Sequence, residues 1–469
     1  MRTIVVGGGI SGLVCAYRLR QLGQDVLLLE ESQRAGGVIG TIQQNNFQFE
    51  LGPQSFLSNP TLLELISSLG LDGELLRADA KAPRYVLLDG ALRKVPLGPP
   101  DLLGTSLLSF GTKLRLLSEP WRRSQPPDRD ESVAAFVRRK FGKDLLENLV
   151  GPLVSGIHAG DPERLSLRSA FPAVHQWEAE HGSVLRGAIK SRPPKGTLRP
   201  GLCSFREGVE SLVRALTATL GDALSTGTRV ERVKRGKANG RSGFEVHVNR
   251  RGREETLNSD ALVLAVPTQA AAAIAGQISE TFRELLGRVE YAPVAVVGAG
   301  YRREQVGHPV EGFGFLVPRK EKLTVLGTVW SSSLFPGRAP EGMVSFTSFV
   351  GGATNTQLMG LSNEQIAKAA EGEVARVLRI SGAPVSRMMQ RWERALPQYN
   401  LGHGNTIVAL EQELRRFPGF FLAGNYLSGA SVGCCAEQAV KTAGEVHEYA
   451  AAQALAEPGH AESDFQKQA

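Results

Sequence analysis

A glycine-rich turn between two short apolar runs opens the chain, and it constrains the fold more than any other feature. Thr3 to Val6 form a β-branched run, and Val26 to Leu29 form a second run that we predict to be a strand. The turn and the start of the helix that we predict after it comprise Gly7, Gly8, Gly9, Ile10, Ser11 and Gly12. A strand, a tight turn, a helix and a second strand form the first unit of a Rossmann-type domain.

Each glycine of the Gly7-x-Gly9-x-x-Gly12 pattern has a mechanical role. Gly7 permits the turn, Gly9 lets the backbone approach a pyrophosphate, and Gly12 lets the helix pack on the strand. The phosphates would lie at the helix N-terminus, where unpaired N–H groups and the helix dipole favour negative charge. Glu30 ends the second strand, where a carboxylate can bind ribose hydroxyls. The alternative is that these glycines only mark a turn.

The segments EESQRAGGVIGT and FQFELGPQSF follow this unit at residues 30–41 and 47–56. They resemble the extended motif of the FAD-dependent amine oxidase and desaturase superfamily. The resemblance implies that Glu30, Arg34 and Gly37 continue the nucleotide site towards a flavin. It also implies that four consecutive residues lie along the isoalloxazine ring, namely Gly52, Pro53, Gln54 and Ser55. We therefore expect FAD rather than NAD as the cofactor.

A second glycine-rich stretch, FFLAGNYLSGASVGCC, lies near the end of the chain at residues 420–435. We predict a strand at 420–423, a glycine turn and a helix that begins near Ser431. The superfamily builds its nucleotide domain from discontinuous segments, so the resemblance implies that this stretch returns to the flavin. The helix N-terminus would stabilise negative charge on the reduced ring. The implied contacts are Asn425, Ala430, Ser431 and Val432. The alternative is a simple packing turn.

Two further fragments fit the same resemblance. The segments at 227–235 and 243–252 predict a β-meander, and 260–270 predicts a return strand; the resemblance lays the Val230 backbone against the adenine. The segment WERALPQYNLGH resembles the signature before the last flavin segment and implies that Trp392 lies near the ring, although a buried core aromatic is an equal alternative. GCCAEQ departs from the superfamily's cysteine-linkage motif, so we expect non-covalent FAD.

Four more segments resemble the protoporphyrinogen oxidase family: KAPRYVLLDGALRKVP, EGFGFLVP, LGTVWSSSLFPGR and SFVGGATN. The similarity extends from Met1 to about residue 452. It implies oxidation of protoporphyrinogen IX to protoporphyrin IX in haem synthesis, with dioxygen as acceptor, three two-electron steps and release of hydrogen peroxide. We expect hydride transfer from a bridging methylene carbon to flavin N5 without a catalytic side chain. The remaining acidic and histidine residues are expected at the surface or in the nucleotide site.

A porphyrinogen is broad and carries acidic side chains, so its site should be an apolar slot with cations at the rim. We assign Phe313, Leu316 and Phe349 to the slot, and Gly314 to a close approach of the backbone to the flat macrocycle, as with Gly312, Gly351 and Gly352. Arg84 is the candidate cation, because Asp89-Gly90 predicts a hairpin that puts Arg84 on the face of Val86 and Leu88. Core packing and a solvated arginine are the alternatives.

The resemblance implies an α/β fold in three parts. A Rossmann-type FAD-binding domain comprises residues 1–80, 201–270 and 395–455. An α+β substrate domain comprises 81–92 and 271–394, and a helical domain comprises 93–200. We expect a loop at 190–201 and a flexible tail at 456–469.

The helical region contains a segment suited to a membrane surface. Residues 100–123 combine apolar and basic side chains. The apolar ones are Leu102, Leu103, Leu107, Leu108, Leu114, Leu117 and Trp121, and the basic ones are Lys113, Arg115, Arg122 and Arg123. We expect a cytoplasmic chain that is peripheral on the cytoplasmic face of the membrane, since no apolar run of about 18 residues is present. A buried helical face is the alternative.

The composition argues against nucleic-acid and metal binding. The net charge of +7 favours anionic partners, but the basic residues are scattered and no basic run carries regularly placed aromatics, so we expect no nucleic-acid partner. The four cysteines lack metal-ligand spacing, so we expect no metal. The resemblance suggests a homodimer and a hand-over of product to a chelatase. The rival functions are coproporphyrinogen III oxidation, amine oxidation and a redox-inert flavin-binding scaffold.

Overall fold

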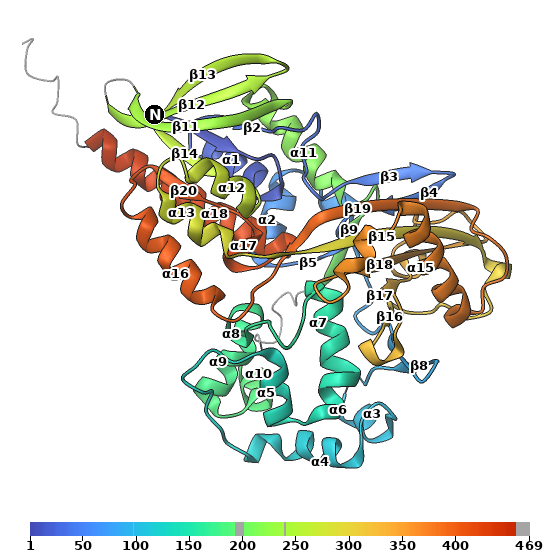
Figure 1. Cartoon of the computed structure of the whole chain (residues 1–469). Helices are drawn as coiled ribbons and strands as arrows, with labels where there is room; N and C mark the ends of the chain where they lie inside the picture. Colours follow the sequence, from blue (N-terminus) through green and yellow to red (C-terminus); the bar gives the residue numbers. More distant parts are fainter. Residues whose placement is uncertain (97, 193–200, 239–240, 456–469) are drawn as a thin grey trace, which may run out of the picture.

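A parallel five-stranded sheet brings together segments from both ends and the middle of the chain (Figure 1). The computed structural model describes residues 1–96, 98–192, 201–238 and 241–455; most of the expected loop at 190–201 and the whole tail at 456–469 lie outside these residues. The strand order is β10-β2-β1-β14-β20, with bounds β1 (Arg2–Val6), β2 (Asp25–Leu29), β10 (Leu224–Ser225), β14 (Ala261–Leu264) and β20 (Phe420–Leu422). The three strands predicted at the two ends of the chain are confirmed to within one residue.

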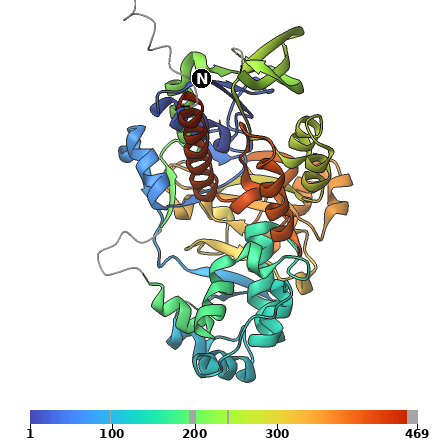
Figure 2. The ribbon, with the colours of Figure 1, turned by 90° about the vertical axis from the view of Figure 1, so that its left-hand side faces the viewer.

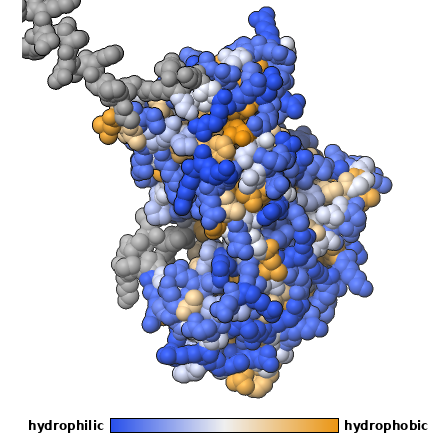
Figure 3. Space-filling model, turned by 60° about the vertical axis from the view of Figure 1, so that its left-hand side comes forward, coloured by the Kyte–Doolittle hydropathy of each residue, from blue (hydrophilic) through white to orange (hydrophobic). Residues whose placement is uncertain are grey.

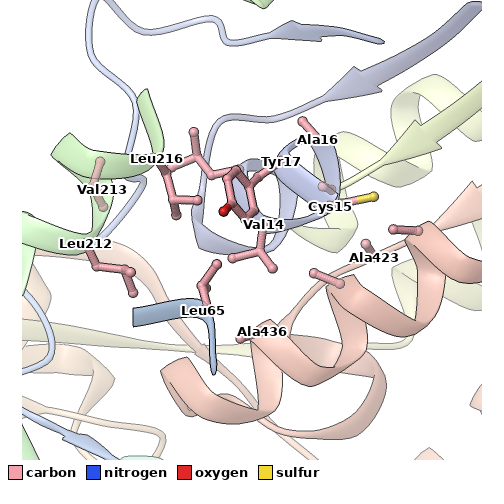
Figure 4. Packing of buried hydrophobic residues seen from close by; sticks show 14 of the residues in the cluster. Val14, Cys15, Ala16, Tyr17, Leu65, Leu212, Val213, Leu216, Ala423 and Ala436 are labelled. Atoms are coloured by element: carbon pink, nitrogen blue, oxygen red, sulfur yellow. The ribbon is translucent and has the colours of Figure 1, made fainter. Parts of the chain in front are cut away.

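Both faces of this sheet are buried, which is why its strands are nearly continuous apolar runs. One face packs against the helices α1 (Ile10–Gln21), α2 (Pro60–Ser68), α11 (Glu210–Leu220) and α18 (Val432–Leu455). Figure 4 shows this core, in which Val14 and Tyr17 of α1 meet Leu216 of α11 and Ala436 of α18. Alternation along the strands sends Val5 into this core and Ile4 into the core on the opposite face.

The opposite face is covered by a three-stranded meander and three helices. These elements are β11 (Thr228–Ala238), β12 (Arg241–Arg250), β13 (Arg253–Ser259), α12 (Thr268–Ala275), α13 (Glu280–Gly287) and α16 (His403–Leu414). The predicted meander and return strand are therefore confirmed. Near the start of β11, the N–H of Thr228 donates to the carbonyl of Glu30 at 2.8 Å, which docks the meander on the end of β2.

A mixed seven-stranded sheet forms the second layer of strands, in the order β19-β15-β18-β17-β16-β7-β8. Its bounds are β7 (Arg84–Leu88), β8 (Ala91–Lys94), β15 (Tyr291–Arg302), β16 (Gly314–Leu316), β17 (Val325–Val329), β18 (Met343–Gly351) and β19 (Ser386–Pro397). Helix α15 (Asn363–Leu378) covers one face. Asp89 and Gly90 have φ of 52° and 72°, which a two-residue type I′ turn requires, so the predicted hairpin is confirmed.

Short strands connect the two large sheets. The hairpin of β3 (Thr41–Gln44) and β4 (Phe47–Glu50) leads into the loop at 51–55, and a small sheet joins β5 (Phe56–Leu57), β9 (Leu202–Phe205) and β6 (Leu75–Arg77). Phe47 and Phe49 of β4 pack against Val294 and Val296 of β15. The loop expected at the flavin therefore starts where the seven-stranded sheet meets the nucleotide-binding part.

Helices dominate residues 99–190, as predicted, and form the lower end of the molecule in Figures 1 and 2. They are α3 (Pro99–Gly104), α4 (Phe110–Ser118), α5 (Val133–Lys140), α6 (Lys143–Leu145), α7 (Gly151–His158), α8 (Leu167–Ala170), α9 (Pro172–His181) and α10 (Val184–Lys190). Within the described residues, no helix combines the length and the apolar character needed to cross a bilayer.

A charged cluster lies inside this helical region and corrects the expectation that acidic residues stay at the surface. The Nζ of Lys140 lies 3.2 Å from a carboxylate oxygen of Glu119 and 3.2 Å from one of Glu178, and all three side chains are at most 5% exposed. Arg139 also donates to Glu178 at 2.9 Å and 3.0 Å. Mutual neutralisation is the physical reason why these carboxylates can be buried.

Candidate active site

The two glycine-rich stretches meet at the N-termini of two adjacent helices. Helices α1 and α18 pack against each other from their first turns, which contain Ser11 and Cys435. Burial raises the pKa of Cys435 to about 12. Ser431 lies directly before α18 and caps it, since its hydroxyl accepts from the N–H of Cys434 at 3.1 Å, so the helix begins near Ser431 as predicted. Two helix N-termini therefore converge, where an anionic cofactor is stabilised by both dipoles.

The first glycine-rich turn leaves a cradle at Gly9. A Cβ built on Gly9 would have no other atom within 4 Å among the described residues, whereas one on Gly12 would lie 1.9 Å from the carbonyl oxygen of Gly7. Gly12 is thus required by packing, and Gly9 borders open space. Gly37 lies beside this space, because its Cβ would be 3.4 Å from the Cα of Gly9, and the N–H of Gly36 donates to Gly8 at 2.7 Å. The cradle fits a pyrophosphate.

The carboxylate of Glu30 lies at the same turn. It accepts from the N–H of Gly8 at 2.6 Å and from that of Ser32 at 2.8 Å, and each oxygen keeps a lone pair for a ribose hydroxyl. Arg34 stabilises the second glycine segment by donating to the carbonyls of Ile39 at 2.9 Å and Gly37 at 3.0 Å.

The predicted adenine contact lies further along the same edge. Val230 is two residues after Thr228, whose N–H donates to the carbonyl of Glu30, so both residues present backbone groups on the edge of β11 that faces the end of β2. The Val230 side chain itself packs into the core.

The loop after β4 is tied to β19 through Trp392. Its indole Nε1 donates to the carbonyl of Leu51 at 2.7 Å, next to the predicted flavin contacts. A Cβ on Gly52 would lie 2.2 Å from the carbonyl oxygen of Val38, so no other residue fits there. Gln54 closes the loop by donating to the carbonyls of Glu50 and Gly52 at 3.2 Å. Pro53 and Ser55 are partly exposed. Trp392 is thus both half-buried and adjacent to the loop.

Of the C-terminal contacts predicted for the flavin, Asn425 lies on α17 (Asn425–Ser428), where we expected only a glycine turn. Ala430 and Ser431 lie on the turn after it, and Val432 is the first residue of α18. Tyr399 donates to the carbonyl of Asn425 at 2.5 Å, and Tyr291 donates to its side-chain oxygen at 3.3 Å. Sequence reasoning overlooked Tyr399 as a residue of this region, although it ends the Pro-Gln-Tyr of the segment at 392–403. Ala430 packs towards the helical region, and Val432 is buried beside α1.

The predicted substrate residues share one region of the seven-stranded sheet. β7 and β16 run side by side in parallel, with Arg84 opposite Gly314 and Val86 opposite Leu316. The guanidinium carbon of Arg84 lies 5.4 Å from the centre of the Phe313 ring, within cation–π range. The structure therefore brings together an arginine and an aromatic ring that are more than 200 residues apart.

Leu316 and Phe349 flank a glycine on the central strand of this region. The register pairs Leu316 with Gly327 and Gly327 with Phe349, so the three positions form a row across β16, β17 and β18. Phe349 packs against the same apolar cluster as Leu51 and Trp392. The row thus leads from the Arg84 side of the sheet to the loop expected at the flavin. The position of Gly327 could not be predicted from the sequence, because only the strand pairing puts it between Leu316 and Phe349.

Helix α7 lies over this row. A Cβ on Gly156 would be 2.6 Å from the Cδ2 of Leu316, so α7 and β16 are in close contact there. Leu153 and Ile157, on the same helix, are 42% and 52% exposed. The helical region therefore contributes an apolar wall that we did not predict.

The structure gives the glycines of this region a different reason from the one we expected. A Cβ on Gly312 would lie 2.3 Å from the carbonyl oxygen of Pro83, and one on Gly314 would lie 2.0 Å from that of Thr328. Gly351 and Gly352 likewise have positive φ and backbone atoms within 2.9 Å. The chain's own backbone therefore requires these four glycines, and a flat macrocycle is not needed to explain them.

Comparisons with known proteins identify the family of this chain. The family model of flavin-containing amine oxidoreductases matches residues 10–447. Protoporphyrinogen oxidase 1 of Arabidopsis thaliana chloroplasts is 33% identical, covering 95% of this chain and 88% of that protein. Coproporphyrinogen III oxidase of Bacillus subtilis is 29% identical, covering 93% of this chain and 95% of that protein.

Solved structures share the fold. An Exiguobacterium protein provisionally assigned as a protoporphyrinogen oxidase superposes with a TM-score of 0.81 at 24% identity, over 95% of this chain and 98% of that one. Cyclohexylamine oxidase from Brevibacterium oxydans superposes with a TM-score of 0.70 at 18% identity, over 96% and 99%. With its convergent helix N-termini and its open cradle at Gly9, the chain belongs to the flavin-containing amine oxidoreductase family and is an FAD-dependent oxidoreductase similar to the protoporphyrinogen oxidases.

Proposed function

We propose that this enzyme oxidises protoporphyrinogen IX to protoporphyrin IX with dioxygen as the electron acceptor. The observation that carries the proposal is the row from Arg84 and Phe313 through Leu316 to Phe349, which ends at the cluster containing Leu51 and Trp392. A cation at one end and apolar side chains along the row suit a flat substrate with acidic groups. The similarity to plant protoporphyrinogen oxidases over nearly the whole chain supports the same substrate.

The chain's own residues bind and orient in this reaction. FAD, when bound, would supply the hydride acceptor, and six electrons would leave the porphyrinogen for dioxygen in three pairs, as hydrogen peroxide. Arg84 would grip a propionate, which fixes the macrocycle in one orientation. Leu316, Phe349 and the α7 wall would exclude water from the reacting carbon.

Anaerobic stopped-flow reduction tests the substrate directly. The purified holoenzyme is mixed with protoporphyrinogen IX without oxygen, and flavin absorbance and porphyrin fluorescence are followed together. We expect rapid bleaching of the flavin, then three equivalents of hydrogen peroxide per porphyrin when oxygen is admitted. A flavin that stays oxidised would reject the substrate and leave an amine oxidase or a redox-inert scaffold.

Coproporphyrinogen III is the second candidate substrate. Arg93 lies on β8 directly opposite Val86, so a second cation stands beside Arg84 at this edge of the sheet. Two cations favour a substrate with four propionates over one with two, and the Bacillus subtilis relative is a coproporphyrinogen III oxidase. The ratio of kcat/KM for the two porphyrinogens, measured with the same protein, decides between them.

Replacing Arg84 is expected to weaken substrate binding without disturbing the flavin. Loss of a charge-assisted hydrogen bond of about 1.5–3 kcal/mol should raise KM by about tenfold to a hundredfold in Arg84→Ala. Steady-state kinetics together with the flavin-to-protein absorbance ratio measures both effects. Arg283→Ala, which removes an exposed arginine paired with Glu280 on α13, is the control. An unchanged KM in Arg84→Ala would take this residue out of the substrate site.

We also propose that the helical region docks on the cytoplasmic face of an anionic membrane through the exposed face of α4. Four large apolar side chains repeat at helical spacing on α4 and the turn after it: Phe110 is 82% exposed, Leu114 57%, Leu117 43% and Trp121 76%. Figure 3 shows hydrophobic residues grouped at the lower end of the molecule, where the helical region lies. Arg115, Arg122 and Arg123 are exposed beside them.

The docking face differs from the expected segment at its N-terminal side. Leu107 and Leu108 are buried and pack against Val86 and Leu88, so they belong to the core that joins the helical region to β7. Leu102 packs partly on the same cluster, and the side chain of Leu103 lies outside the part of the chain that the structure describes. The corrected face therefore begins at Phe110.

Vesicle flotation tests the docking face. With vesicles containing about one third anionic lipid, we expect the double variant Phe110→Ser, Trp121→Ser to bind at least about fivefold less than the unaltered protein. Leu455→Ser removes a side chain that is 87% exposed at the end of α18 and should bind normally. Equal binding by all three proteins would exclude α4 as the docking face.

A homodimer and hand-over of product to a chelatase remain predictions, which sedimentation and mixed-enzyme assays can test.

A further inference from the structure

A buried ion pair lies at the base of the loop expected to face the flavin. Glu50 ends β4 directly before Leu51, and Arg338 lies between α14 (Ser331–Leu334) and β18. A guanidinium nitrogen of Arg338 is 3.7 Å from Oε1 of Glu50, and the two side chains are 2% and 3% exposed. Two charges so far from water need further hydrogen bonds, and the partners that supply them decide what the pair connects.

The carboxyl group of Glu50 connects the loop to the nucleotide-binding part. The hydroxyl of Thr41 donates to its Oε2 at 2.6 Å, and the N–H of Val209, directly before α11, donates to its Oε1 at 3.0 Å. Burial raises the pKa of Glu50 to about 7, against the opposing effects of the Thr41 hydrogen bond and the Arg338 charge. The effect of burial on the pKa of Glu50 is therefore larger than the combined effect of its polar contacts.

The guanidinium of Arg338 reaches from the segment before β18 into the nucleotide-binding part. It donates to the carbonyls of Arg206 at 3.1 Å and Phe205 at 3.0 Å, and to the hydroxyl of Ser204 at 2.7 Å. The carbonyl of Arg338 also accepts from the N–H of Gln48 on β4 at 3.3 Å. One side chain thus holds β9, the segment before α11 and β4 in one arrangement.

This arrangement fixes the start of the loop. The N–H of Leu51 donates to the carbonyl of Gly40 at 2.8 Å, and the carbonyl of Leu51 accepts from Trp392 at 2.7 Å. The carbonyl of Glu50 accepts from the side chain of Gln54 at 3.2 Å. A shift of Glu50 would therefore pass directly to Gly52, which packs too closely against Val38 to move freely.

We propose that Glu50 and Arg338 are positioning residues that hold the loop at 51–55 in register with the flavin ring. The inference rests on the proposed placement of this loop along the isoalloxazine. It adds a device in which Glu50, on β4, and Arg338, on the segment before β18, tie the start of the loop to β9 and to the residue before α11. Loss of the pair should change the surroundings of the flavin, beyond any change in the stability of the fold.

The test compares Arg338→Met with the unaltered holoenzyme. Methionine keeps much of the volume but leaves the Glu50 carboxyl buried beside no cation, so the loop should shift. We expect release of FAD, followed by its fluorescence, to become at least about tenfold faster. The visible absorption and circular dichroism of the bound flavin should change, and kcat should fall while KM for the porphyrinogen stays within about twofold.

Two further variants keep the test decisive. Arg338→Lys retains the charge and should recover part of the flavin signals, and Glu50→Gln retains the shape without the charge. If Arg338→Met does not fold, the flavin spectra of these two variants carry the test, since the proposal expects both to differ from the unaltered spectrum. Spectra and release rates like those of the unaltered protein would then overturn it.

The control is Lys140→Met, which breaks the other buried charged cluster in the helical region, away from the flavin loop. It should lose stability but keep the flavin spectrum and the rate of FAD release. If Arg338→Met loses stability to a similar extent with both flavin signals unchanged, the pair is only structural. The flavin signals need no porphyrinogen, so failure of the proposed substrate would not be mistaken for failure of this inference.

Discussion

Gly9→Ala is expected to lower the affinity for FAD by about a hundredfold, or about 2.7 kcal/mol, while the fold stays intact. The Cβ of alanine would meet no other described atom, and Gly9 has φ of −69° and ψ of 176°, which alanine adopts freely. The methyl group would instead occupy the space where the pyrophosphate approaches the backbone. Titration of the apoprotein with FAD measures the affinity, and circular dichroism of the apoprotein checks the fold.

The matched control is Gly444→Ala, at a position on α18 where a Cβ also meets nothing within 4 Å among the described residues. It should bind FAD normally and gain about 1 kcal/mol of stability, because alanine favours a helix interior over glycine. If Gly9→Ala bound FAD as tightly as this control, the cradle at α1 would not be the pyrophosphate site. If its apoprotein unfolded, Gly9 would be a structural glycine like Gly12.

Lys140→Met is expected to lower the free energy of unfolding by about 3–5 kcal/mol. The ammonium group lies between Glu119 and Glu178, and it also donates to the carbonyl of Gly182 at 3.2 Å. Its removal breaks the ion pair of Glu119 and leaves Glu178 paired with Arg139, which also pairs with Glu131. Urea unfolding followed by far-ultraviolet circular dichroism measures the loss.

Lys143→Met is the control for this prediction. Lys143 lies three residues further along, is 74% exposed and pairs with Glu147 at 3.4 Å. A solvent-exposed pair contributes less than about 1 kcal/mol, so this variant should unfold almost as the unaltered protein does. Similar losses in both variants would mean that the burial of the cluster has no energetic consequence.

The same cluster predicts how stability depends on acid. Burial alone would raise the pKa of Glu178, but hydrogen bonds from Arg139 and Ser124 and the charge of Lys140 outweigh it and lower the pKa to about 2. A lowered pKa stabilises the fold above the ordinary value of 4.5, and this contribution is lost as the pH falls from 4.5 towards 2. In Lys140→Met the pKa of Glu178 in the folded protein should rise back towards 4.5, so the melting temperature should fall less between pH 5 and pH 3 than it does in the unaltered protein.

The turns and helix starts of this chain could be predicted because each is determined by residues that are adjacent in the sequence. The strand, glycine turn and helix at residues 3–21 form a contiguous unit, and the helix after Ser431 begins at a residue able to cap it. The Asp89-Gly90 hairpin follows from two residues that tolerate positive φ. In each case neighbours in the sequence are also neighbours in space.

The burial of residues on β4 could not be predicted from local sequence patterns. Gln48 and Glu50 alternate with Phe47 and Phe49, and strand periodicity would turn the two polar residues towards water. All four residues are buried, because Arg338 arrives from a segment almost 300 residues away and covers the second face. No local pattern predicts this contact, so the pair that holds the flavin loop was visible only in the structure.

At the substrate side of the site, some features could likewise be predicted from the sequence and others were decided by the tertiary structure. The sequence by itself determined which residue types were available, and it determined the glycine-rich turns, the hairpin and the family resemblance. Only the tertiary structure set Arg84 opposite Gly314, put Gly327 between Leu316 and Phe349, and laid α7 over the row. The physical reason is that strand register and domain packing minimise exposed apolar surface over the whole chain at once, whereas turns and helix starts obey forces between adjacent residues.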